Sequence, residues 1–326
     1  MTGLDPVRLG VLSTARIADA IIGGAKEATA AEVVAVASRD RSRADEWAAA
    51  RGLAHAFGSY EEMLACDEVE AVYVPLPNSM HLPWSVRALE AGKHVLCEKP
   101  LSRRAADVED AFDAAEQAGR LLMEAFMWRY HPQTEKLVSL VREGAAGEVR
   151  LVRAAFGFPL PPGSNVRWSA ELEGGALMDV GCYCVSALRL LAGEPSHVSA
   201  EAVVGGEDID ARMSGVLRFD GDVLGLFDCG FDVAKRSAIE VVGSEGSIVS
   251  ADPWHGGSPD LRVLRDGSAE RIQVAAANPY GLELDDFAQA VRAGAAPRLG
   301  RDDAVGQARV IEALYAAAEA GSAVRL

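Results

Sequence analysis

The sequence predicts a two-domain protein that combines a doubly wound parallel α/β sheet with a carboxy-terminal α+β domain built on a large, mostly antiparallel open sheet. Three observations support this fold class. Short apolar strands alternate with helices in the first third of the chain, strand follows strand with few helices after residue 149, and 326 residues exceed the size at which one hydrophobic core keeps growing. We expect the domains at residues 1–127 and 128–326, and we leave open whether the last helix packs back on the first domain.

The first domain is predicted from apolar runs of strand length that are separated by helical patterns. The strands are 8–12, 33–37, 71–74, 95–98 and 121–124, and the helices are 17–26, 41–51, 60–65, 81–91 and 103–118. Helices between successive strands provide the long crossovers that parallel pairing requires. This alternation is typical of dinucleotide-binding domains.

The second domain is predicted from longer alternating stretches at 149–158, 198–204, 213–219, 223–231 and 239–242. Asp-Gly-Asp at 220–222 and Gly-Ser-Glu-Gly at 243–246 are turn sequences that favour hairpins. Helices at 282–293 and 302–320 complete the chain. Because helices are expected on one face of the sheet, the other face is free to bury against a partner subunit.

The composition limits the possible partners. With 49% hydrophobic and 25% charged residues the chain can form a packed core, and 32 basic against 48 acidic residues give a net charge of −16. That charge argues against nucleic acid and anionic membranes as partners. The sequence shows no apolar run long enough to cross a bilayer and no signal-like amino terminus, so we expect a cytoplasmic protein.

The cysteines and histidines follow no pattern typical of a disulfide framework or a metal site. The five cysteines, at positions 66, 97, 182, 184 and 229, are an odd number without framework spacing. Cys182 and Cys184 are separated by one residue, whereas zinc-binding pairs normally have about two to four residues between them. We therefore predict reduced thiols and no metal.

Lys99 ends an apolar strand and precedes Pro100, which disfavours helical geometry at the lysine. We expect Lys99 to lie extended at the carboxyl edge of the parallel sheet, where ligands bind in open α/β folds. An ammonium group there can polarise a carbonyl or stabilise an alkoxide, as reversible alcohol oxidation requires. A solvated lysine before a helix-starting proline is the alternative interpretation of this pair alone.

The turn after the first strand is a degraded form of the glycine-rich motif that binds dinucleotide pyrophosphates. From Gly10 to Ala18 it reads Gly-Val-Leu-Ser-Thr-Ala-Arg-Ile-Ala, with small residues in place of the later glycines. The second strand ends in Ser38 and Arg39, which suit a 2′-phosphate and so favour NADP. Asp40 is able to accept a hydrogen bond from a ribose hydroxyl, which keeps NAD possible. A plain strand-to-helix turn and a surface arginine are the alternatives.

A cluster from Gly174 to Tyr183 places a carboxylate and a phenol four residues apart. If residues 176–191 are helical, Asp179 and Tyr183 share one face. A lysine ammonium nearby would lower the pKa of the phenol and make tyrosine a usable proton donor and acceptor. The alternative is an amphipathic helix whose tyrosine simply reaches water.

Together these segments resemble the glucose-fructose oxidoreductase/inositol dehydrogenase (Gfo/Idh/MocA) family. The resemblance rests on residues 10–18, Ser38-Arg39, Glu98-Lys99-Pro100, Met-Trp-Arg-Tyr-His-Pro at 127–132, and 174–183, in matching order and spacing. It covers nearly the whole chain and implies an amino-terminal Rossmann domain and a second domain whose open sheet commonly serves oligomerisation. Tyr183 stands where many members have histidine. Tyrosine there resembles the branch of dihydrodiol dehydrogenase, xylose dehydrogenase and the deoxysugar 3-ketoreductases.

The resemblance implies a role for each matching residue. Lys99 would orient the substrate oxygen and stabilise its charge, Tyr183 would transfer the proton, and Asp179 would bind the substrate or position the pair. The expected cofactor residues are Ser13, Thr14, Ala15, Arg16 and Ile17 at the pyrophosphate, Ser38 and Arg39 at the adenosine phosphate, Leu76, Pro77, Asn78 and His81 at the nicotinamide half, Glu98 at its ribose, and Lys99, Arg167 and Trp168 beside it.

The resulting hypothesis is an NADP(H)-dependent oxidoreductase that transfers hydride between nicotinamide and a hydroxyl or keto carbon of a sugar or sugar derivative. Lys99 and Tyr183 are its catalytic pair, and a homodimer or homotetramer through the carboxy-terminal sheet is its expected assembly. A trans-dihydrodiol or D-xylose dehydrogenase acting oxidatively is the alternative within the same chemistry. A non-catalytic dinucleotide-binding regulator is the alternative from another class.

Overall fold

The computed structural model describes residues 5–206 and 208–326, which form two compact units. The first comprises the described residues up to Ser102, together with Ala106–Met127 and Asn278–Val305. The second comprises the described residues of Arg103–Ala105, Trp128–Ala277 and Gly306–Leu326. The late segment Asn278–Val305, which the sequence expectation places in the second domain, therefore groups with the first unit. None of the described helices is both long and apolar enough to traverse a membrane.

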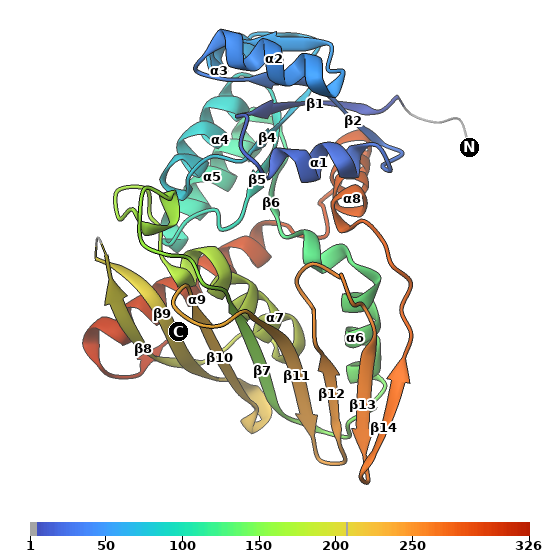
Figure 1. Ribbon diagram of the computed structural model, residues 1–326, viewed down its shortest axis with the longest axis vertical. Helices are drawn as coiled ribbons and strands as arrows, with labels where there is room; N and C mark the ends of the chain where they lie inside the picture. The colour runs from blue at the N-terminus through green and yellow to red at the C-terminus, as the bar shows by residue number, and fades with distance from the viewer. Residues whose placement is uncertain (1–4, 207) are drawn as a thin grey trace. The chain divides into compact units, whose positions relative to one another are not determined.

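The first unit is built on a six-stranded sheet in the order β3-β2-β1-β4-β5-β6 (Figure 1). Its strands are β1 (Val7–Leu12), β2 (Ala31–Ala37), β3 (His55–Phe57), β4 (Ala71–Val74), β5 (His94–Glu98) and β6 (Leu122–Ala125). All neighbouring strands are parallel, and the order reverses between β1 and β4. The prediction of a doubly wound sheet is confirmed, and in such sheets ligands bind at the carboxyl edge beside the reversal.

Helices cover both faces of this sheet, with α1 and α8 on one side and α4 and α5 on the other (Figure 1). The helices are α1 (Ala18–Ala25), α2 (Arg41–Arg51), α3 (Tyr60–Leu64), α4 (His81–Glu90), α5 (Ala105–Ala118) and α8 (Pro279–Ala293). Local signals set several ends: Asp40 and Ser59 cap α2 and α3, and Gly52 ends α2 in the left-handed conformation. Gly24 lets α1 pack on the backbone of α8, because a Cβ there would lie 2.7 Å from Gly281 N.

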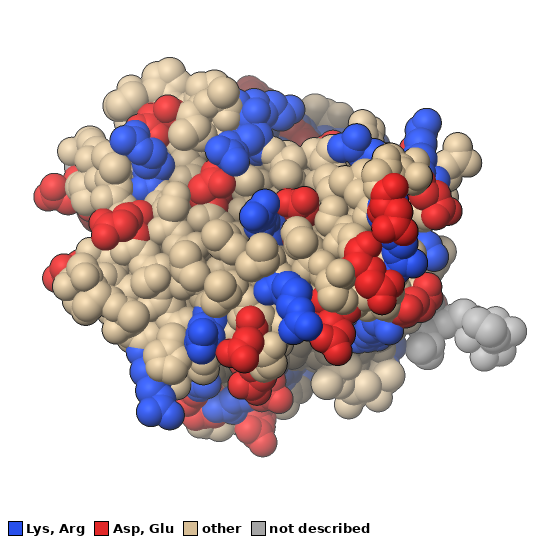
Figure 2. Space-filling model, turned by 90° about the horizontal axis from the view of Figure 1, so that it is seen from below, with Lys and Arg blue, Asp and Glu red and all other residues tan. Residues whose placement is uncertain are grey.

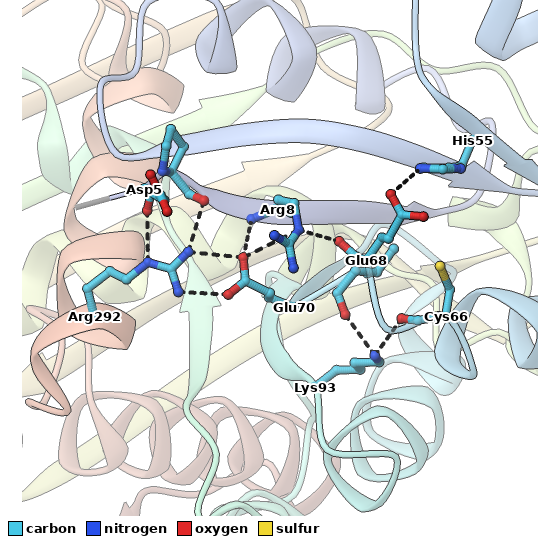
Figure 3. A network of polar contacts seen from close by, with 10 residues as sticks. Asp5, Arg8, His55, Cys66, Glu68, Glu70, Lys93 and Arg292 are labelled. Carbon is cyan, nitrogen blue, oxygen red and sulfur yellow. Dashed lines mark hydrogen bonds and ion pairs between the residues drawn. The ribbon is translucent and has the colours of Figure 1, made fainter. Parts of the chain in front are cut away.

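Arg292 holds the far end of α8 against the start of β1 and the approach to β4 (Figure 3). Its guanidinium forms two bonds with the Glu70 carboxylate, at 2.7 and 3.0 Å, and donates to the carbonyls of Asp5 and Pro6 at 2.9 Å each. Glu70 also accepts a hydrogen bond from Arg8 N at 3.1 Å. These contacts fix the late segment on the parallel-sheet unit.

The Glu70–Arg292 pair should contribute to stability in a pH-dependent way. The hydrogen bond from Arg292 lowers the pKa of Glu70 to about 2, and burial opposes this shift. Because the pKa is lower in the folded than in the unfolded chain, the contribution is complete above about pH 4.5 and is lost as the pH falls toward 2. In denaturant titrations, Arg292→Ala should lower the free energy of unfolding by about 2 kcal/mol near neutral pH and by progressively less in acid.

A matched control is Arg41→Ala, which removes the exposed Arg41–Asp45 pair at 3.0 Å. This change should cost less than about 0.5 kcal/mol at any pH. A destabilisation by Arg292→Ala that stays constant from neutral pH into acid would contradict this assignment.

The second unit is built on a nine-stranded sheet in the order β14-β13-β12-β11-β7-β10-β9-β8-β15. Its strands are β7 (Val149–Gly157), β8 (His197–Gly205), β9 (Ile209–Arg218), β10 (Leu224–Gly230), β11 (Arg236–Gly243), β12 (Ser247–Ser250), β13 (Leu261–Arg265), β14 (Ser268–Ile272) and β15 (Val324–Arg325). Neighbouring strands are antiparallel except for β7 and β10 at the centre. The predicted open, mostly antiparallel sheet is confirmed.

One face of this sheet is covered and the other is exposed. The helices of the unit are α6 (Pro132–Arg142), α7 (Cys182–Ala192) and the part of α9 (Arg301–Ala320) that begins at Gly306, and α7 packs on β7 and β10. Along β9, Met213 and Leu217 are buried while Ser214 and Val216 are exposed, as the alternating pattern predicts. The predicted turns at 220–222 and 243–246 join β9 to β10 and β11 to β12.

The structure adds elements that the sequence patterns did not indicate, namely β3, α6 and the strands β12 to β15. The strands among these elements have two to five residues, too few to show a clear period, whereas α6 is an amphipathic helix of 11 residues whose pattern the sequence reading overlooked. The five cysteines are free, and all except the half-buried Cys66 are buried. On the face shown in Figure 2, the described basic and acidic side chains are intermingled rather than gathered by sign.

Candidate active site

Three strands of the parallel sheet end next to one another where the strand order reverses. β1 is followed by Ser13, β4 by the loop that contains Leu76, and β5 by Lys99. Because β4 pairs with both β1 and β5, the three loops are neighbours along the carboxyl edge. The structure therefore gathers most of the predicted cofactor residues of the first unit at one edge.

The turn after β1 keeps the geometry of a glycine turn without the glycine. Ser13 has a φ of 152°, a region that glycine adopts far more easily than serine. Gly10 has no room for a side chain, since a Cβ would lie 2.4 Å from Met63 Sδ. Among the described residues no side chain caps α1 at Ile17, and Ala18 N and Asp19 N donate instead to Ala15 O at 3.0 Å and Arg16 O at 3.3 Å in the turn itself. The turn thus suits a pyrophosphate.

Arg39, Ser13 and Tyr60 form a polar group beside the end of β2. Burial raises the pKa of Tyr60, whereas the Arg39 charge and a hydrogen bond with Ser13 lower it. The two predicted residues therefore lie close to a tyrosine that sequence reasoning missed. The signal that could have found Tyr60 is its place at the start of a helix that follows Ser59.

Asp40 is engaged in its own helix. Its Oδ1 accepts hydrogen bonds from Ser42 N at 2.9 Å, from Ser42 Oγ at 2.7 Å and from Arg43 N at 3.3 Å. These hydrogen bonds, that from the Ser42 hydroxyl foremost, lower the pKa of Asp40. Ser38 is buried, and its Oγ accepts from Asp40 N at 3.2 Å. The carboxylate that kept NAD possible thus serves as a helix cap.

His81 links the loops that follow β4 and β5. Its Nδ1 lies 2.7 Å from Pro100 O and its Nε2 lies 2.8 Å from Leu76 O. Burial lowers the pKa of His81 to about 4, so the ring is neutral near pH 7 and donates to one of these carbonyls. His81 is only 1% exposed, so its role at the carboxyl edge of the sheet is to hold the loops after β4 and β5 together.

Glu98 and Lys99 end β5 with buried support from neighbouring elements. Glu98 accepts a hydrogen bond from the Tyr73 hydroxyl on β4. Burial, and next the Glu98 charge, raise the pKa of Tyr73 and also that of the buried Glu283 on α8. The half-buried Lys99 follows Glu98, and its peptide bond to Pro100 is cis. The strand end before the lysine is therefore anchored from β4.

The segment that carries Asp179 differs from the prediction of one helix over 176–191. It begins as a π-helix, Leu177–Gly181, and continues as α7. Two glycines account for its packing. A Cβ at Gly175 would lie 2.2 Å from Asp210 Oδ1, and a Cβ at Gly181 would lie 2.7 Å from Cys229 Sγ. Such single π-turns occur frequently at functional sites.

Asp179 is paired with Arg167. The Arg167 Nε donates to Asp179 Oδ2 at 2.6 Å, and the two side chains are 42% and 15% exposed, respectively. Trp168 is buried in the second unit, with its ring centroid 5.5 Å from that of Phe231. The structure thus brings Arg167 and Asp179 together and buries Trp168 beside Phe231 in the core of the second unit.

Tyr183 lies in an aromatic cluster that sequence reasoning missed. Its ring centroid is 5.4 Å from that of Phe156 on β7 and 5.7 Å from that of Trp254, and both contacts are edge-on. Tyr183 is 8% exposed. The indole of Trp254 is itself fixed by a hydrogen bond to Ala155 O at 3.1 Å. The rings of Phe156 and Trp254 restrict the rotation of the phenol.

The parallel sheet reverses its strand order beside a glycine-type turn, and it has Arg39 after β2 and Lys99 after β5. This combination is typical of a dinucleotide-dependent oxidoreductase. Residues 7–126 match the profile described as oxidoreductase family, NAD-binding Rossmann fold, and residues 134–249 match the GFO/IDH/MocA C-terminal domain. The chain belongs to the GFO/IDH/MocA family of oxidoreductases, as its motifs predicted.

Relatives of known activity match along almost the full chain. A D-xylose 1-dehydrogenase (NADP(+)) from Haloferax volcanii is 40% identical, with 97% of this chain and 99% of that protein covered. The solved structure of a 3-ketoreductase from Actinomadura kijaniata with NADP and TDP-benzene has a TM-score of 0.91 at 33% identity, with 96% and 98% covered. That of an aldose-aldose oxidoreductase from Caulobacter crescentus with glycerol has a TM-score of 0.92 at 28% identity, with 98% and 100% covered.

Proposed function

We propose that this protein is an NADP(H)-dependent oxidoreductase that interconverts a hydroxyl and a keto group on a sugar or sugar derivative, with Lys99 and Tyr183 as its catalytic pair. The observation that carries the proposal is the presence of both residues at fixed places. Lys99 stands at the carboxyl edge of the parallel sheet, and Tyr183 is clamped on α7 by aromatic rings. The related dehydrogenase and ketoreductases support the reaction class.

A second observation supports the pair. Solved structures of the Actinomadura kijaniata ketoreductase include variants in which one lysine is replaced by alanine or glutamate and one tyrosine by phenylalanine. The lysine and the tyrosine of that protein are separated by the same number of residues as Lys99 and Tyr183. This equal spacing supports the assignment of Lys99 and Tyr183 as the pair.

The first unit has donors that fit NADP. Ser13, Thr14, Ala15, Arg16 and Ile17 would hold the pyrophosphate with backbone amides, and Ser38 and Arg39 would bind the 2′-phosphate. Asp40 favours this assignment, because its carboxylate already accepts three hydrogen bonds within α2. Leu76, Pro77 and Asn78, held by His81, would flank the nicotinamide half, with Glu98 at its ribose. The roles of Arg167 and Trp168 as cofactor residues stay predictions. The guanidinium of Arg167 also donates to Asp179.

The chain's own residues would move one proton. The nicotinamide, when bound, takes up or supplies the hydride. In oxidation, Tyr183 as the phenolate would accept the hydroxyl proton of the substrate and become the neutral phenol, while Lys99 donates a hydrogen bond to the same substrate oxygen and stabilises its negative charge. In reduction, Tyr183 would return the proton to that oxygen. Asp179, paired with Arg167, would orient the substrate.

A coupled assay with a substrate panel tests the proposal. Purified protein should oxidise NADPH with keto sugars or keto deoxysugars, or reduce NADP⁺ with aldoses such as D-xylose. If the protein turns over only D-xylose or only a trans-dihydrodiol, and only in the oxidative direction, the alternative of a D-xylose or trans-dihydrodiol dehydrogenase is favoured. Tight NADPH binding without turnover of any panel member would indicate a regulator instead.

We further propose that a second copy of this chain covers the exposed face of the nine-stranded sheet. This face has a hollow of about 730 Å³ whose lining includes Arg153, Glu240, Arg236 and Asp228. Arg153 pairs with Glu240 at 3.2 Å and Arg236 with Asp228 at 3.1 Å. Alternating charges on one face are self-complementary, since each sign can meet the opposite sign of a two-fold related copy.

Light scattering tests this interface. The wild type should measure as a dimer or tetramer, and Ser214→Arg, which introduces a charged side chain at the hollow on β9, should yield a smaller species. Ser268→Arg on the exposed strand β14 is the control and should leave the mass unchanged. A wild-type monomer, or a Ser214→Arg variant with unchanged mass, would exclude the interface.

A further inference from the structure

Asp210 on β9 is a buried carboxylate that holds the start of the segment carrying Asp179 and Tyr183. It is 6% exposed, and its Oδ2 accepts a hydrogen bond from Leu177 N at 2.6 Å. Leu177 is the first residue of the π-helix, and the residue before it provides no side-chain cap. The Asp210 carboxylate on β9 thus accepts the hydrogen bond that a helix-capping side chain would otherwise accept.

The carboxylate is held by other contacts within the second unit. The Tyr315 hydroxyl on α9 donates to Asp210 Oδ1 at 2.8 Å, and the Arg103 guanidinium lies 4.2 Å from the centre of the Tyr315 ring. Gly175 passes directly over the same oxygen, which explains why this position lacks a side chain. Asp210 therefore joins α9, β9 and the first turn of the proposed catalytic segment.

Both hydrogen bonds that Asp210 accepts come from neutral donors, the Leu177 amide and the Tyr315 phenol. Burial raises the pKa of Asp210 to about 6, and hydrogen bonds from Leu177 and Tyr315, together with the Arg103 charge, only partly oppose it. Cys229 on β10 also faces the group, and burial raises the pKa of this thiol, so it is neutral. A neutral side chain with an acceptor oxygen would thus serve nearly as well as a carboxylate.

We propose that Asp210 is a positioning residue for the reaction, setting the place of Asp179 and Tyr183 through its hydrogen bond to Leu177 N. The proposal rests on the proposed function of Tyr183. A displacement of about 1 Å at a reacting group can cost on the order of a hundredfold in rate. Loss of the acceptor should therefore lower kcat without affecting cofactor binding by the first unit.

The test compares Asp210→Ala with Asp210→Asn. Asp210→Ala should lower kcat by about tenfold to a hundredfold and leave the Kd for NADPH unchanged. Asp210→Asn should retain most of kcat, because its amide oxygen can accept from Leu177 N while its NH₂ donates to the Tyr315 oxygen. Asp222→Asn, at an exposed carboxylate in the turn between β9 and β10, is the control and should match the wild type.

Hydrogen exchange separates this proposal from the proposed function. Asp210→Ala should speed amide exchange over residues 176–183, and Tyr183→Phe should not. Faster exchange with unchanged kcat, or equal loss of kcat in Asp210→Asn and Asp210→Ala, would overturn the positioning role. Wild-type turnover in Tyr183→Phe would instead overturn the proposed function. If Asp210→Ala does not fold, Tyr315→Phe serves in its place and should lower kcat several-fold, whereas unchanged kcat would overturn the proposal.

Discussion

Replacing Tyr183 by phenylalanine should lower kcat by about 10²–10⁴-fold and leave the affinity for NADPH unchanged. The change removes only the hydroxyl to which we assign proton transfer. The phenylalanine ring should keep the position of the tyrosine ring, because the contacts with Phe156 and Trp254 are made between rings and do not need the hydroxyl. Steady-state kinetics with the best substrate of the panel, together with a fluorescence titration with NADPH, measures both quantities.

Lys99→Ala should lower kcat by about 10²–10³-fold, as expected when a preorganised donor to the substrate oxygen is lost. The double variant should be little worse than Tyr183→Phe, since the two residues act on the same oxygen and their effects are not additive. Lys26→Ala, at an exposed lysine after α1, is the control and should match the wild type. Wild-type turnover in Tyr183→Phe would assign the proton transfer to another group.

Replacing Arg39 by alanine should raise the Kd for NADPH by about tenfold to a hundredfold and change that for NADH little. A hydrogen bond to a charged group is worth about 1.5–3 kcal/mol, and the proposed partner of Arg39 is the 2′-phosphate that only NADPH carries. Arg39 shares its surroundings with Ser13 and Tyr60, so the guanidinium is placed beside the phosphate turn. Parallel fluorescence titrations with the two cofactors measure the effect.

Arg43→Ala is the control for Arg39, because Arg43 is an exposed arginine on the neighbouring helix α2. It should shift neither Kd. Equal weakening of NADPH and NADH binding by Arg39→Ala would show that Arg39 supports the fold of the site and does not select the cofactor.

The sequence predicted the parallel sheet because its strands are apolar and separated by helices of sufficient length. The end of β5 and the turn after β1 could be located for the same reason, which placed Lys99 and Ser13 at the correct edge. β3 was missed because three residues, His55–Phe57, are too few to show a period. The return of α8 to the first unit was missed because its decisive contacts, such as Arg292 with Glu70, join residues far apart in the chain.

In the candidate site, too, features with a local sequence signal were predicted and features set by long-range contacts were not. Residue type and spacing were enough to single out Asp179 and Tyr183, but not the π-helix that contains Asp179, where Gly175 and Gly181 are closely packed. Asp210 gave no signal because a carboxylate in an alternating strand is usually solvated. Only the fold shows that Leu177 N and the Tyr315 hydroxyl converge on it.

The most direct test of the central claim is transfer of label between substrate and cofactor. The protein is incubated with NADP⁺ and a sugar from the panel that carries deuterium on the carbon to be oxidised, and the reduced cofactor is examined by mass spectrometry. Hydride transfer predicts that the deuterium appears in NADPH and that Tyr183→Phe slows its appearance about as much as it slows kcat. NADPH that forms without deuterium, or no NADPH with any sugar of the panel, would contradict the account.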